Sequence, residues 1–97
     1  MSKDSKKNIV ASNATEKELR EVSKNLEPIL RLGKRGIDDK IIEEIQLHLK
    51  KRKLIKIKFL KAFMENYNRR TIGDEIAKRT HSRVILQVGG VLVLFRP

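Results

Sequence analysis

Apolar residues at spacings of three and four open the first readable stretch of the chain, and this spacing predicts an amphipathic helix. Leu19, Val22 and Leu26 share one face of it. Thr15, followed three positions later by a glutamate, forms the capping-box pattern that begins a helix. Pro28 is expected to end the helix, because the residue before a proline is displaced from the α region.

Two further helices are predicted by the same spacing. The second begins at Asp38 or Asp39, residue types that cap helices well, and its inward face is Ile41, Ile42, Ile45 and Leu49. The third is expected to run from near Tyr67 to Thr80, although a glycine at position 73 weakens it by about 1 kcal/mol relative to alanine. Its inward residues are Ile72, Ile76 and Ala77.

Strands are predicted by a different period. Ile55, Ile57 and Phe59 alternate with Lys56 and Lys58, which indicates a strand with one buried face and one cationic face. Residues 29–32 form a shorter apolar run before a glycine-containing turn. Residues 84–88 and 91–95 flank two glycines, the pattern of a hairpin. The last run lacks polar residues, so this strand is expected to be central or covered on both faces.

The predicted order is therefore α-β-α-β-α-β-β. The first two strands flank a helical crossover and should be parallel, whereas the hairpin pair should be antiparallel. The fold class is thus α+β, a two-layer sandwich with a small mixed four-stranded sheet. With 97 residues in total, we expect a flexible polar tail over residues 1–14 and a single domain over residues 15–97.

The charge of the chain indicates which class of partner it binds. The chain has 23 Lys and Arg against 12 Asp and Glu, a formal charge of +11. Residues 33–58 are the densest part, with nine basic and four acidic residues. Such a field concentrates polyanions, of which nucleic acid is the commonest. No apolar run is long enough to cross a bilayer, and the chain does not begin like a signal peptide, so a cytoplasmic location without membrane contact is expected.

The turn that is best suited to hold an anion comprises Gly33, Lys34, Arg35 and Gly36, which we call the glycine loop. Glycine allows close backbone approach, and the following helix directs its positive dipole end here. Lysine supplies a point charge, and arginine supplies a fork that matches phosphate oxygens. The alternative is a tight turn whose basic residues face only water.

Other basic residues could extend this surface. A run at the end of the second helix and two positions on the following strand are candidate nucleic-acid contacts: Lys50, Lys51, Arg52, Lys53, Lys56 and Lys58. The alternative is pairing with the helix dipole and a solvated strand face. Basic residues around the third helix, among them Arg69 and Arg70, could form a second contact, but a solvated face is the favoured interpretation. Phe63 and Tyr67 could stack on bases, but local packing is the favoured interpretation.

Catalytic chemistry is not indicated. The chain has no cysteine, and its two histidines, His48 and His81, have no ligand-spaced partners. The acidic residues at the start of the second helix are explained by capping and dipole preference. We expect no enzyme activity, no metal site and no cofactor.

Three blocks of residues resemble the CRM domain (YhbY-like) family: residues 26–36, 54–58 and 90–97. The resemblance implies an RNA-binding protein whose fold is similar to the C-terminal domain of bacterial translation initiation factor three. It also implies that the glycine loop contacts RNA. The family includes stand-alone prokaryotic proteins linked to large-subunit ribosome precursors. Phe95 stands where tyrosine is common, and residues 60–70 fit the family pattern poorly.

These observations predict a non-enzymatic, monomeric protein that binds ribosomal RNA of large-subunit precursors during ribosome assembly. Alternatives are a basic scaffold that binds an acidic protein, binding of intron RNA, and DNA binding. DNA binding is less favoured because no helix-turn-helix is evident.

Overall fold

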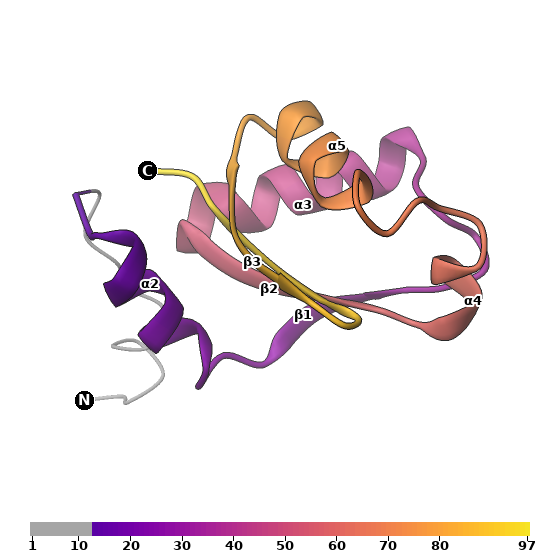
Figure 1. The fold of residues 1–97 in the computed structure, drawn as a ribbon. Coiled ribbons are helices and arrows are strands. Elements are labelled where there is room, and N and C mark those ends of the chain that lie inside the picture. Colours follow the sequence, from indigo (N-terminus) through magenta and orange to yellow (C-terminus); the bar gives the residue numbers. More distant parts are fainter. Residues whose placement is uncertain (1–12) are drawn as a thin grey trace.

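A four-stranded sheet is the centre of the computed structural model, which describes residues 13–97 (Figure 1). Its strands are β1 (Pro28–Leu32), β2 (Leu54–Phe59), β3 (Arg83–Val88) and β4 (Val91–Phe95), in the order β1-β2-β4-β3. β1 and β2 are parallel, and β4 is antiparallel to both of its neighbours. The predicted α+β class, the mixed sheet and the central position of the last strand are all confirmed.

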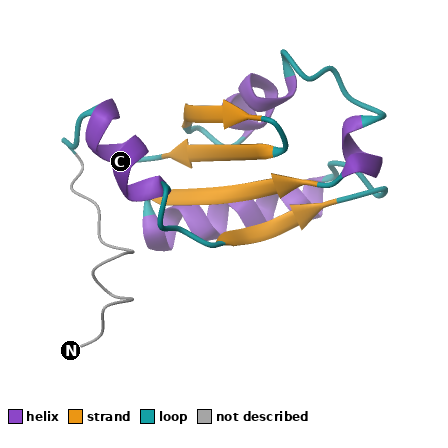
Figure 2. Ribbon diagram, turned by 60° about the horizontal axis from the view of Figure 1, so that its bottom comes forward, coloured by secondary structure: helices purple, strands orange, loops and turns teal. Residues whose placement is uncertain are grey.

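Helices cover the two faces of the sheet unequally. α3 (Asp39–Arg52) and α5 (Ile72–Arg79) pack on one face over the larger core. α2 (Glu16–Ser23) packs on the opposite face, over a smaller cluster that includes Leu19 and Phe95. In Figure 2, α3 passes behind the sheet while α2 lies at one end in front of it. β4 therefore contributes to both cores, which explains its uninterrupted apolar sequence.

The first two helices begin as the sequence predicts. Thr15 and Glu18 form the expected capping box at the start of α2. The side chain of Asp38, rather than that of Asp39, caps α3. α2 ends at Ser23 and not at Pro28, because the amides of residues 24–26 donate to carbonyls three residues earlier and tighten the backbone into turns. Leu26 nevertheless packs on the smaller cluster.

The prediction of one helix from Tyr67 to Thr80 is wrong at its beginning. An additional short helix, α4 (Lys61–Met64), follows β2, and α5 starts only at Ile72. Asn68 provides the physical reason for the interruption: its side-chain oxygen accepts a hydrogen bond from the Arg70 amide at 2.8 Å. Such a local bond competes with helical hydrogen bonding.

Backbone hydrogen bonds join several chain turns at one end of the sheet. The Leu60 amide donates to the Leu32 carbonyl at 2.8 Å, which ties the end of β2 to the end of β1. The Phe59 amide donates to the Gly90 carbonyl at 2.6 Å, which ties β2 to the β3–β4 turn. We call this end of the sheet the loop end.

Residues 1–12 of the predicted tail lie outside the described residues. Within residues 13–97, no helix has the length and apolarity to span a membrane.

Candidate nucleic-acid interface

The glycine loop connects β1 to α3 at the loop end of the sheet. The Gly36 amide donates to the Gly33 carbonyl at 3.0 Å and closes a tight turn. Lys34 and Arg35 occupy the two central positions of this turn, and both are exposed. Gly36 has a φ of 75°, in the left-handed region that favours glycine. The turn thus presents two neighbouring cations to solvent.

Tyr67 holds the base of the glycine loop in place. Its hydroxyl oxygen accepts a hydrogen bond from the Ile37 amide at 3.0 Å and occupies the space that a β-carbon at Gly36 would need. The ring stacks on Phe63 at 4.4 Å between centroids, and Phe63 stacks on Phe59 at 4.7 Å. Through this column of rings the loop is anchored to the core. The interpretation of Phe63 and Tyr67 as packing residues agrees with these contacts, although the sequence did not reveal that Tyr67 supports the loop.

Asp38 occupies the start of α3 and limits what that helix terminus can bind. Its carboxylate accepts a hydrogen bond from the Ile41 amide at 2.8 Å, and this bond, aided by the nearby Arg35 charge, lowers the pKa of Asp38. The Arg35 guanidinium lies 3.4 Å from the other carboxylate oxygen, with 79% of the Arg35 side chain exposed. Such an exposed pair contributes little to stability and exchanges readily with another anion. The exposed loop side chains are therefore more accessible to an anion than the capped helix amides.

The open face of the sheet continues the basic surface beside the loop. Lys58 is exposed on β2, on the face opposite α3. Its Cα partner in β1 is Arg31, also exposed, two residues before the glycine loop. Arg31 was not identified from the sequence as a candidate contact. The predicted parallel pairing of β1 and β2 was the signal that could have placed it beside Lys58. Lys56 lies one pleat farther from the loop and is half-buried.

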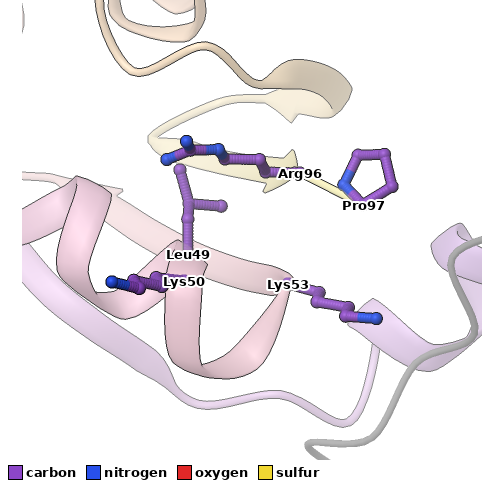
Figure 3. Close-up of a pocket in the computed structure, with 5 residues that line it drawn as sticks. All are labelled: Leu49, Lys50, Lys53, Arg96 and Pro97. Carbon is purple, nitrogen blue, oxygen red and sulfur yellow. The ribbon is translucent and has the colours of Figure 1, made fainter.

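The basic run at the end of α3 lies away from the glycine loop. α3 has 14 residues, so about 21 Å of helix separates its two ends at 1.5 Å per residue. Lys50 and Lys53 line a cavity of about 300 Å³ together with Leu49, Arg96 and Pro97 (Figure 3). The Lys53 carbonyl accepts a hydrogen bond from the Arg96 amide at 2.8 Å, which joins this helix end to the end of β4.

The structure therefore divides the predicted contacts into two groups. The glycine loop and Lys58 lie at or near the loop end, with Lys56 farther along the same strand. The second group is at the opposite end of α3, beside the chain terminus: Lys50, Lys51, Arg52 and Lys53. Figure 1 shows this separation, with α4 near one end of α3 and the C-terminus near the other.

Metal ligation finds no support among residues 13–97, which contain no group of three or more potential ligands. His48 lies on α3 with a buried Nδ1 that has no hydrogen-bond partner in the described residues. Burial, reinforced by the charge of Arg52, lowers the pKa of His48. The imidazole is thus held neutral at pH 7, as expected of a packed side chain.

Comparison with known proteins gives a consistent result. The model of the CRS1 / YhbY (CRM) domain matches residues 12–96. "Probable RNA-binding protein MJ0652" of Methanocaldococcus jannaschii is 39% identical over 79 residues, which is 81% of this chain. The chain spans only 58% of that relative's length. "Probable RNA-binding protein YqeI" of Bacillus subtilis is 31% identical, with 80% of this chain and 79% of the relative covered.

A protein of Haemophilus influenzae named "RNA-binding protein" is 30% identical and covers 81% of this chain and 78% of its own length. Among solved structures, the solution structure of the hypothetical protein SAV1595 from Staphylococcus aureus is similar. It has a TM-score of 0.68 at 26% identity, and the match covers 84% of this chain and 83% of the other.

Proposed function

The chain belongs to the CRS1 / YhbY (CRM) domain family, and we propose that it is an RNA-binding protein that grips the RNA backbone with its glycine loop. Relatives named as RNA-binding proteins support the ligand class. One observation carries the choice of site: Lys34 and Arg35 are exposed side by side on a turn whose base is held by Tyr67. A turn fixed in advance loses less conformational entropy on binding than a mobile one.

In the proposed mechanism, Arg35 releases Asp38 and places its fork on two oxygens of one phosphate. Lys34 neutralises the next phosphate as a point charge. Arg31 and Lys58 extend the contact onto the adjoining sheet face. Phosphate contacts of this kind fix position and orientation but do not read bases, so RNA shape would select the site. No step requires bond making or breaking, and the proposed role is non-enzymatic.

The proposed target is ribosomal RNA of large-subunit precursors, in the cytoplasm, as the resemblance of a single CRM-like module implies. The basic group at the far end of α3, which includes Lys50 and Lys53, is proposed to contact a second segment of the same RNA. Crosslinking in cells, followed by sequencing of the attached RNA, tests this target. Recovery mainly of messenger or intron RNA would contradict it.

Removal of both loop cations tests the proposed site. The double variant Lys34→Ala with Arg35→Ala should bind an RNA stem-loop about tenfold more weakly at physiological salt. The slope of log affinity against log salt should fall by about 1 for each lost phosphate contact. Fluorescence anisotropy over a salt series measures both quantities.

The matched control removes two exposed cations, Lys17 in α2 and Lys24 at the C-cap of that helix. Among residues 13–97, Lys24 has its single ion pair with Glu21 in an exposed contact, so stability should change little. This control has the same net charge as the loop variant and should retain nearly wild-type affinity. Equal affinity of the two folded variants would exclude the glycine loop as the site. Nuclease-resistant capture of an acidic protein, without RNA binding, would instead favour a scaffold.

A further inference from the structure

A second basic hollow lies beside the β3–β4 turn. It has a volume of about 300 Å³ and is lined by Arg69, Arg70, Gln87 and Gly89. The two arginines belong to the connection between α4 and α5, and both are exposed. Neither guanidinium has an ion pair with a described carboxylate. The hollow therefore carries two positive charges that no described residue neutralises.

Hydrogen bonds fix the backbone that carries these arginines. Gln87 on β3 donates from Nε2 to the Arg69 carbonyl at 2.7 Å. The Arg70 amide donates to the Asn68 side chain at 2.8 Å. Gly73 on α5 leaves the space that the Gln87 side chain fills, since a β-carbon there would collide with Gln87 Oε1. Contacts among β3, α5 and the connection between α4 and α5 therefore fix the wall of the hollow.

The hollow lies at the same end of the sheet as the glycine loop. Arg69 follows two residues after Tyr67, whose hydroxyl accepts the Ile37 amide at the base of that loop. Gly89 belongs to the turn whose next residue, Gly90, accepts the Phe59 amide at the end of β2. Figure 2 shows the β3–β4 turn, α4 and the turn after β1 at this one end.

We propose that the hollow binds a phosphodiester group of the same RNA strand that crosses the glycine loop, an inference that rests on the proposed function. Two arginine forks suit the planar, bidentate geometry of phosphate oxygens. At Gly89 an added β-carbon would meet nothing within 4 Å, so a sugar–phosphate backbone can approach the turn closely. The RNA path therefore turns from the glycine loop toward the β3–β4 turn and not only along β2.

Binding of an RNA stem-loop with a single-stranded tail to four full-length variants tests this path. The double variant Arg69→Ala with Arg70→Ala should bind about tenfold more weakly and lose about 1 to 2 from the salt slope. Arg69→Lys with Arg70→Lys keeps the charge and should recover only part of the affinity, because it lacks the fork. The loop variant K34A/R35A and the control K17A/K24A complete the set, with circular dichroism to verify folding.

Amide chemical shifts provide a second readout that does not depend on substitution. In the wild-type protein, RNA should shift the Gly89 and Arg70 amide signals together with those of the glycine loop. If R69A/R70A binds like K17A/K24A while K34A/R35A is weakened, the hollow is not an RNA site although the proposed function stands. If no variant binds less RNA than the wild type, the proposed function itself fails. Shifts at Gly89 caused by an acidic peptide but not by RNA would also overturn the inference.

Discussion

Gly36 shows how a single residue can be required by two independent constraints. Its φ of 75° lies where side-chain-bearing residues are strained, and the Tyr67 hydroxyl occupies the space that a β-carbon would need. Gly33 meets neither constraint, because a β-carbon there would make only an ordinary contact with Leu60 at 3.4 Å. The two glycines of the loop look equivalent in the sequence, yet only Gly36 leaves no space for a side chain.

Alanine substitution at the two glycines should therefore give different results. Gly36→Ala should lower the free energy of unfolding by about 1–3 kcal/mol, from backbone strain and displacement of Tyr67. It should also weaken RNA binding, because the loop loses its support. Gly33→Ala is the matched control and should change stability by less than about 1 kcal/mol. Urea denaturation and RNA titration of both variants measure these effects, and equal stability losses would refute the distinction.

At the scale of elements, α3 sets the spacing between the two basic groups. The helix begins at the Asp38 cap beside the glycine loop and ends at Arg52, about 21 Å away at 1.5 Å per residue. This distance exceeds the Debye length of about 8 Å at physiological salt, so charges at the two ends act independently. In the proposed binding mode, a short RNA held at the glycine loop cannot reach the distal group, whereas a long RNA can.

Removal of the distal charges should therefore have an effect that depends on RNA length. Lys50→Ala with Lys51→Ala should weaken binding of a long structured RNA several-fold and leave binding of a short oligonucleotide at the loop nearly unchanged. Anisotropy titrations with both RNAs, with K17A/K24A as the charge-matched control, measure the difference. A long-RNA affinity equal to that of the control would show that the end of α3 serves only its helix dipole.

At the scale of the whole molecule, the net charge of +11 has the largest effect on how the protein responds to salt. The ion pairs of the protein do little to offset the repulsion among its cations, because pairs such as Arg20–Glu16 and Arg79–Asp39 are exposed. Repulsion among the cations destabilises the folded state, while the same cations attract RNA. Stability and affinity should therefore respond to salt in opposite directions.

Raising the salt concentration from low to physiological values should increase the midpoint of thermal unfolding while reducing RNA affinity. Screening weakens the internal repulsion in the first case and the attraction to phosphate in the second. Calorimetry and anisotropy in one set of buffers measure both, and potassium chloride and potassium glutamate should agree if screening is the cause. A midpoint that falls with salt would show that attractive ion pairs dominate the folded state.

The sequence alone determined the α+β class, the parallel and antiparallel pairing and the capping box at Thr15, because these depend on local periodicity, capping residues and turn glycines. It also identified the family through residues 26–36, 54–58 and 90–97. The division of the basic residues, the support of the loop by Tyr67 and the position of Arg69 and Arg70 beside Gly89 were decided by tertiary structure. Each of these depends on residues that are distant in the chain and come into contact only when the strands pair. The local spacing of residues does not predict such long-range contacts.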